Sequence, residues 1–174
     1  MSWYRIGDKF ACVPPKNGST SFKMAVCGQT STANLNHWAE SYSCGPFETP
    51  GSPAYLSVRD PVDRFCSLWR CCQREHYHAE SFVTRYALQG CNTEYLMSVI
   101  ETCDNPHWWP QTAFTVPGAI PIHYAEFLAF LGLPVARENE SVYLPCEPPV
   151  ERIKSYYEGD FKLWSQTSQP LAGL

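Results

Sequence analysis

The chain has 174 residues, of which 44% are hydrophobic and 14% aromatic, and its net charge at pH 7 is −4. This composition excludes a disordered chain, and the length suits a single domain that buries about 70% of its unfolded surface. The acidic balance argues against nucleic acid as a partner, because proteins that bind the phosphate backbone normally carry a basic surplus.

The compartment is predicted from what the sequence lacks. No run of about twenty apolar residues occurs, so no membrane partner is expected. The opening residues, MSWYRIGDKF, do not have the pattern of a secretion signal, and a cytoplasmic protein is expected. The nine cysteines are therefore predicted to be reduced thiols, with Cys12 and Cys66 buried like small apolar residues.

The first predicted unit is a buried strand over residues 10–13, a glycine turn and a helix from Ser19 or Thr20. The free N–H groups at the start of a helix favour an anion, Lys16 adds a charge, and Gly18 lets the main chain approach closely. The triphosphate-loop pattern GxxxxGK is not matched, since the lysine precedes the glycine. The alternative is an ordinary strand-to-helix turn with an exposed lysine.

Residues 28–53 are rich in Ser, Thr, Asn, Gly and Pro, which predicts a long loop. His37, Glu40 and Glu48 lie in it and are candidates for a general base, because a histidine titrates near neutral pH and surroundings can raise the pKa of a glutamate. The alternative is that they are solvated loop residues.

A second predicted unit is a short buried strand over residues 55–58 followed by a helix over 62–74, with Asp60 as its cap. Arg59 stands at the carboxyl end of the strand, and Ser67 lies about two helical turns further on. Together they could hold a second phosphate. The alternative is a structural ion pair between Arg59 and a neighbouring aspartate.

The residues that follow indicate helices and give little evidence of a functional site. Cys71, Cys72, His76 and His78 have no CxxC spacing, so no metal site is predicted. Residues 81–101 have helical spacing broken near Gly90. In the segment 104–114, Trp108 and Trp109 suit either a ligand pocket or the core, and His107 is a further candidate base.

The last third of the chain predicts a strand over residues 119–123 and a short helix over 126–131. A final helix is expected from Pro148 or Pro149 through Phe161. Residues 165–174 are expected to be a flexible tail.

The two phosphate-binding stretches together resemble the sulfotransferase family that uses 3'-phosphoadenosine 5'-phosphosulfate (PAPS). In that family a PKxGSTS-like loop holds the 5'-phosphosulfate, and a VRDPxxRxxSxxR-like segment holds the 3'-phosphate. The first pattern is matched by Pro15, Lys16, Gly18, Ser19, Thr20 and Ser21. The second is matched by Val58, Arg59, Asp60, Pro61, Arg64, Ser67 and Arg70.

Two later segments extend the resemblance to residues 10–164. PHWWPQ at 106–111 is similar to the HWxPQ element of the carbohydrate sulfotransferase branch, and IKSYYEGDF at 153–161 is similar to its IxxxYxxDF ending. One departure is that Ser21 stands where the cytosolic branch has an aromatic residue that stacks on adenine. Phe22 comes one residue later, so the partner of adenine is unassigned.

The resemblance implies an α/β fold with a small, mostly parallel sheet between helices and a P-loop-like strand, loop and helix. It implies sulfuryl transfer from PAPS to an acceptor hydroxyl, expected on a carbohydrate, with adenosine 3',5'-bisphosphate released and no metal required. The expected catalytic residues are Lys16, His37, Glu40 and His107. The expected cofactor ligands are Pro15, Lys16, Asn17, Gly18, Ser19, Thr20, Ser21, Arg59 and Ser67.

Two other classes share the predicted fold. A nucleotide or nucleoside kinase would need Mg²⁺ and a complete triphosphate loop, which this sequence lacks. An inactive nucleotide-binding module would bind the nucleotide without turnover. No oligomeric state is predicted.

Overall fold

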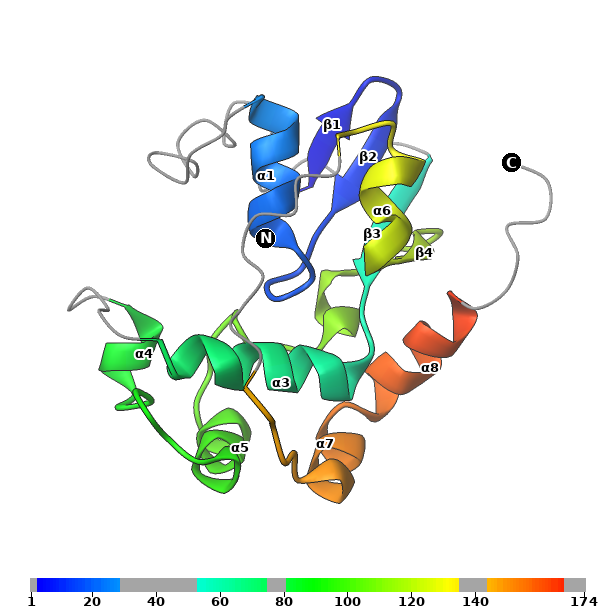
Figure 1. The fold of residues 1–174 in the computed structure, drawn as a ribbon. Coiled ribbons are helices and arrows are strands. Elements are labelled where there is room, and N and C mark those ends of the chain that lie inside the picture. Colours follow the sequence, from blue (N-terminus) through cyan, green and yellow to red (C-terminus); the bar gives the residue numbers. More distant parts are fainter. Residues whose placement is uncertain (1–2, 29–52, 75–80, 135–143, 168–174) are drawn as a thin grey trace.

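A computed structural model describes residues 3–28, 53–74, 81–134 and 144–167 (Figure 1). Its centre is a four-stranded sheet in the order β1-β2-β3-β4, with β1 antiparallel to β2 and the other two pairs parallel. The predicted α/β fold with a small, mostly parallel sheet flanked by helices is therefore confirmed. The strands are β1 (Tyr4–Ile6), β2 (Lys9–Cys12), β3 (Ala54–Val58) and β4 (Ile120–His123).

Three of these strands lie where the sequence predicts them, and β1 was not predicted. Three residues are too few to show an alternating pattern, so β1 has no periodic signal of its own. The turn between β1 and β2 does carry a sequence signal for a β-hairpin. Gly7 stands at the first position of this two-residue turn and has a φ of 63°. Glycine favours that conformation.

The described α-helices agree with the prediction up to α6, but the short 3₁₀ helix at 111–114 was not predicted, and the last predicted helix is divided into two. Tyr157 interrupts it with a φ of −107° and a ψ of 29°, and its buried ring faces the core. The second of these helices includes Ser165 and Gln166, so the predicted tail began too early. The helical segments are α1 (Ser19–Cys27), α3 (Pro61–Cys72), α4 (Phe82–Arg85), α5 (Thr93–Thr102), η1 (Gln111–Phe114), α6 (Tyr124–Phe130), α7 (Val150–Tyr156) and α8 (Glu158–Gln166).

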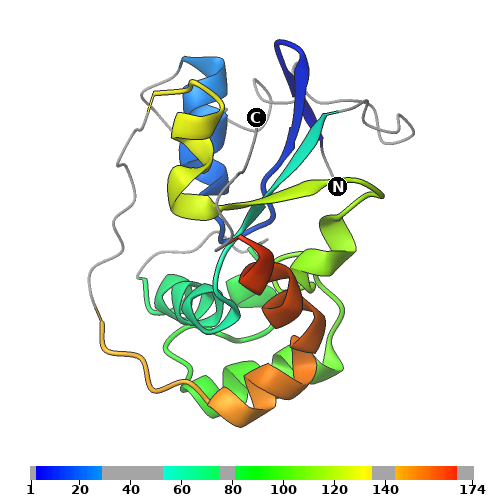
Figure 2. The same ribbon diagram turned by 90° about the vertical axis from the view of Figure 1, so that its right-hand side faces the viewer.

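Helices cover both faces of the sheet (Figures 1 and 2). On one face, α1 and α6 pack through Phe22 and Phe127, and the ring of Phe22 meets that of Tyr4 edge-on with centroids 5.2 Å apart. On the other face, Phe114 of η1 and Trp164 of α8 pack against the strands. The sheet is thus the middle layer of three.

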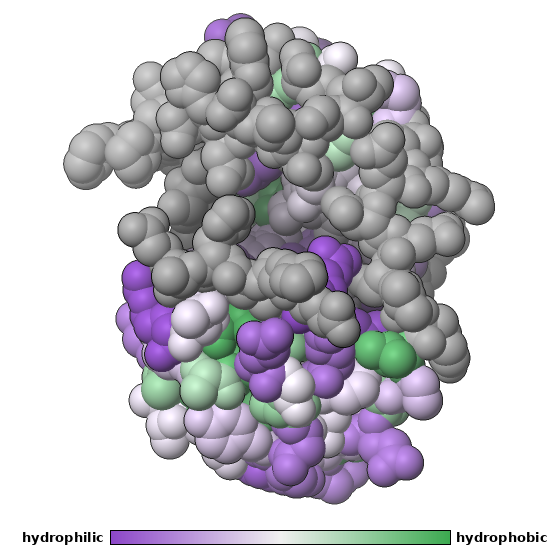
Figure 3. Space-filling model, turned by 60° about the vertical axis from the view of Figure 1, so that its left-hand side comes forward, coloured by the Kyte–Doolittle hydropathy of each residue, from purple (hydrophilic) through white to green (hydrophobic). Residues whose placement is uncertain are grey.

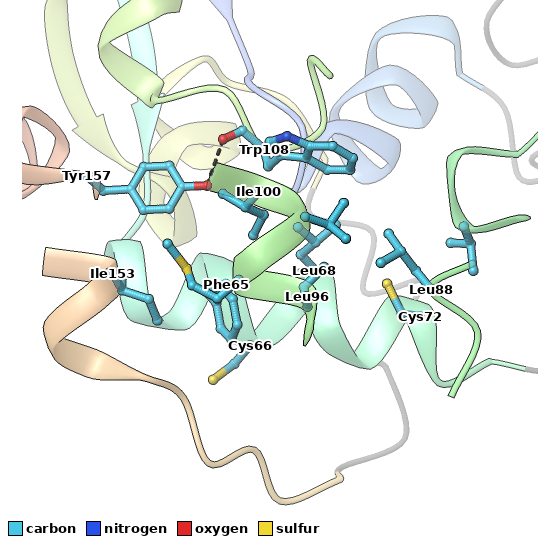
Figure 4. Packing of buried hydrophobic residues seen from close by; sticks show 13 residues of the cluster. Phe65, Cys66, Leu68, Cys72, Leu88, Leu96, Ile100, Trp108, Ile153 and Tyr157 are labelled. Atoms are coloured by element: carbon cyan, nitrogen blue, oxygen red, sulfur yellow. Dashed lines mark hydrogen bonds between the residues drawn. The ribbon is translucent and has the colours of Figure 1, made fainter. Parts of the chain in front are cut away.

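A separate helical cluster lies beyond the carboxyl ends of the parallel strands, formed mainly by α3, α4, α5 and α7 (Figure 1). Leu68 of α3 and Leu96 of α5 are buried at its centre, and the Tyr157 hydroxyl donates to the Trp108 carbonyl at 2.7 Å (Figure 4). Trp108 is 1% exposed and is therefore part of this core. The carboxyl ends of the strands accordingly face this cluster across the loops that follow them.

The described surface carries few exposed apolar side chains. Large hydrophobic residues are exposed at Tyr95, Leu144 and Val150 alone among the described positions. On the face in Figure 3, hydrophilic and hydrophobic residues are interspersed over the coloured part. Cys12 and Cys66 are buried, as predicted. None of the helices in the described ranges has both the length and the apolar character needed to cross a membrane.

Replacing Asp60 with alanine tests the start of α3. The Asp60 carboxylate accepts the N–H groups of Val62 and Asp63 at 2.8 and 3.0 Å, so Asp60→Ala should lower the free energy of unfolding by about 1 kcal/mol. Urea denaturation measures this loss. Asp60→Asn keeps the accepting oxygen and should lose much less, and equal losses in the two variants would contradict the capping role.

Candidate functional site

The loop that joins β2 to α1 has an unusual backbone. Lys16 has a φ of 69° and Gly18 a φ of 79°, so two residues in three adopt the left-handed conformation. Gly18 is the N-cap of α1 and has no side chain to cap that end, and the first turn of the helix carries no acidic residue. The positive end of the helix dipole therefore opens on the loop without a carboxylate from its own first turn. Such an end favours an anion.

The side chain of Asn17 hydrogen-bonds this loop to strand β3. Its side chain is 2% exposed, and its Nδ2 donates to the Ser57 carbonyl of β3 at 2.8 Å and to Gln111 Oε1 at 2.6 Å. Both N–H bonds of the amide are thus used inside the protein. Asn17 therefore positions the loop through its side chain, a role the sequence did not suggest.

Arg59 links the end of β3 to the same loop. Its Nη1 donates to the Lys16 carbonyl at 3.0 Å, and its guanidinium lies 4.6 Å from the centre of the Tyr124 ring. Its Nε is buried without a hydrogen-bond partner among the described residues. None of the described ion pairs joins Arg59 to Asp60 or Asp63, so the structural ion pair considered as the alternative role of Arg59 does not form.

Arg64 is a second arginine beneath the loop, and sequence reasoning gave it no role. Its side chain is 4% exposed, its Nε donates to the Pro15 carbonyl at 3.1 Å, and its Nη1 lies 3.9 Å from Asp160. Burial lowers the pKa of Arg64, and the nearby Tyr157 phenol and Asp160 carboxylate oppose that shift. Its Nη2 has no partner in the described part of the chain. The sequence did offer one signal for such a role, because Arg64 belongs to the VRDPxxRxxSxxR-like segment, one helical turn after Asp60.

Gln111 and Asp160 complete the support of the loop, and both are fully buried. Gln111 Oε1 accepts the backbone N–H of Arg59 at 2.8 Å, and its Nε2 donates to the Arg59 carbonyl at 2.8 Å. The Asp160 carboxylate accepts the N–H groups of Gln111 and Thr112 at 2.7 and 3.0 Å. We call Asn17, Arg64, Gln111 and Asp160 the buried polar network. It brings segments from four parts of the chain to one place.

His107 lies beside this network and is half-buried. It lines a small pocket of about 10 Å³ together with Arg64, Leu68 and Tyr157, enough for about one water molecule. Burial, together with the positive charges of Lys16, Arg64 and Lys23, lowers the pKa of His107 to about 4. The ring is therefore neutral at pH 7.

The remaining predicted site residues are brought together only in part. Ser67 is half-buried on α3, and the described hydrogen bonds include none between it and the loop. The candidate bases His37 and Glu40 lie outside the described residues, as do Glu48, His76 and His78. In the described ranges, no three histidine, cysteine or acidic side chains gather to hold a metal ion.

Comparisons with family models, with curated proteins and with solved structures give no match for this chain.

Asp160→Asn tests the buried polar network. The change removes the charge next to Arg64 and one of the oxygens that accept the N–H groups of η1, so it should lower the free energy of unfolding by about 3 kcal/mol. Glu158→Gln on the same helix is the matched control, because its carboxylate is exposed and pairs with the exposed Lys162. Equal denaturation midpoints for the two variants would contradict a supporting role for Asp160.

The pKa of His107 predicts a loss of stability in acid. Between pH 6.5 and about 4 the unfolded chain binds a proton at this ring that the native protein does not, so the free energy of unfolding should fall as the pH falls through this window. Above pH 6.5 the contribution of His107 to the free energy of unfolding is fully present. Denaturation curves across the window should show a shallower decline in His107→Gln, and parallel declines would contradict the prediction.

Proposed function

We propose that this protein is a PAPS-dependent sulfotransferase that transfers a sulfuryl group to an acceptor hydroxyl, with a carbohydrate as the expected acceptor. The observation that carries the proposal is the hydrogen bond from Arg59 Nη1 to the Lys16 carbonyl. It joins the two stretches that carry the sequence resemblance, 43 residues apart. Their strands, β2 and β3, are parallel neighbours, and ligands of open α/β sheets bind at the carboxyl ends of such strands.

The donors near the loop fit a ligand with two anionic groups. Buried polar groups are nearly always paired, so Arg59 Nε and Arg64 Nη2, which have no described partner, suit an external acceptor. The uncapped start of α1 offers backbone N–H groups as well. The proposed ligands for the 5'-phosphosulfate are Lys16, Gly18, Ser19, Thr20 and Ser21. Pro15 and Asn17, which the sequence also suggested as ligands, instead shape the loop, because proline has no N–H group and the N–H groups of Asn17 are bonded within the protein. Arg59 and Ser67 are the proposed ligands for the 3'-phosphate.

The chain's own groups would supply the catalysis. PAPS provides the sulfuryl group when bound. Lys16 and the N–H groups at the start of α1 would stabilise the negative charge that develops on the leaving phosphate oxygen, where fixed donors lower a barrier most. A base, with His37, Glu40 and His107 as candidates, would take the proton of the acceptor hydroxyl. The product of the cofactor is adenosine 3',5'-bisphosphate.

Lys16→Gly tests the catalytic charge without straining the loop, because the φ of 69° at this position suits glycine. Transfer of labelled sulfate from PAPS to a panel of oligosaccharides should fall roughly 100-fold or more, while the thermal midpoint is preserved. Lys162→Ala, a change of an exposed lysine on α8, is the matched control and should keep full activity. Wild-type protein that transfers sulfate to no hydroxyl acceptor would contradict the proposal.

A further inference from the structure

We propose that Nε2 of His107 is the atom that accepts the proton of the acceptor hydroxyl, and that Asn105 is the residue that positions it. This inference rests on the function proposed above. It selects one base from the three candidates and assigns a role to Asn105, a residue without any motif signal of its own.

Asn105 fixes the tautomer of His107. Asn105 Oδ1 accepts the backbone N–H of His107 at 3.0 Å, so the oxygen and not the NH₂ group of the amide occupies this position. The same oxygen lies 2.8 Å from His107 Nδ1. Since an amide oxygen can only accept, Nδ1 must carry the proton. Nε2 is left with a free lone pair, which is the requirement for a base.

The ring of His107 is also held in place. It stacks on Phe82 of α4, with ring centroids 4.1 Å apart and an angle of 26° between the planes. Asn105 is 8% exposed, and its carbonyl accepts the N–H of Trp108 at 3.2 Å, which anchors the turn to the core. A base whose orientation is fixed before the substrate arrives loses little entropy in the reaction.

Three positively charged side chains, one of them in the loop between β2 and α1, act on the pKa of His107. Lys16 of the loop, Arg64 of α3 and Lys23 of α1 all disfavour its protonation, with Lys16 the strongest of the three. Phe82 is apolar, and Tyr157, which lines the same pocket, is uncharged at pH 7 because burial raises its pKa. An anion bound beside Lys16 would offset the positive charges and raise the pKa of His107. The His107 ring would then be a stronger base when an anion is bound at the loop.

The proton balance of the step is simple. The acceptor oxygen forms its bond to sulfur while its proton moves to His107 Nε2. The bond between sulfur and the leaving phosphate oxygen breaks, and its electron pair stays on that oxygen. His107 afterwards releases the proton to solvent, so no oxidant, reductant or metal is needed.

The test is nitrogen NMR of the histidine rings in the full chain, with His107→Gln to assign the signal among the five histidines. We expect Nδ1 to be protonated, a pKa near 4, and a rise of about one unit or more when adenosine 3',5'-bisphosphate is added. Asn105→Ala should let Nε2 carry the proton, and Asn105→Asp should restore the native tautomer. Protonation at Nε2 in the wild type would overturn the proposal. So would a pKa of His107 that stays the same when the bisphosphate binds.

The transfer assay separates this proposal from the proposed function. His107→Gln should lower transfer roughly 100-fold or more while its affinity for the bisphosphate stays close to that of the wild type. Asn105→Ala should lower turnover and change the acid limb of the pH profile, which a purely structural loss would not do. Transfer that survives His107→Gln overturns only the assignment of the base. Failure of the wild type to bind the bisphosphate overturns both.

Discussion

The side-chain amide of Gln111 holds the carboxyl end of β3 to the loop that follows β2. It bonds both backbone groups of Arg59, and its Oε1 also accepts from Asn17. A fully buried amide must have its partners, because leaving it unpaired costs more than the bonds contribute. The loop, the end of the strand and η1 are therefore constrained together, and Asp160 fixes the position of Gln111 by accepting its N–H.

This constraint places positive charge where a chain of net charge −4 would not suggest it. Lys16, Arg59 and Arg64 converge at one end of the sheet, and Asp160 is the carboxylate that pairs with Arg64. The arginine side chains support the loop through its carbonyl oxygens, so they contribute to the fold as well as to the local charge. A local basic site in an acidic protein suits a small anionic ligand better than a polyanion.

The sequence predicts the units of this fold better than the contacts between them. The buried runs of β2 and β3 and the cap at Asp60 have local signals, and all three are found where the patterns put them. The division between α7 and α8 has no local signal, because the turn at Tyr157 depends on the burial of the Tyr157 side chain against Trp108. Gln111 and Asp160 were missed as supports of the site for the same reason: a polar residue in one sequence does not reveal whether it is buried.

The most direct test of the proposed anion site is calorimetric titration with adenosine 3',5'-bisphosphate, in parallel with ATP and Mg²⁺. We expect the wild type to bind the bisphosphate, Arg59→Ala to lose most of that affinity, and Arg85→Ala, a change at an exposed arginine on α4, to keep it. Binding of ATP with Mg²⁺ in place of the bisphosphate would contradict the account and favour a kinase.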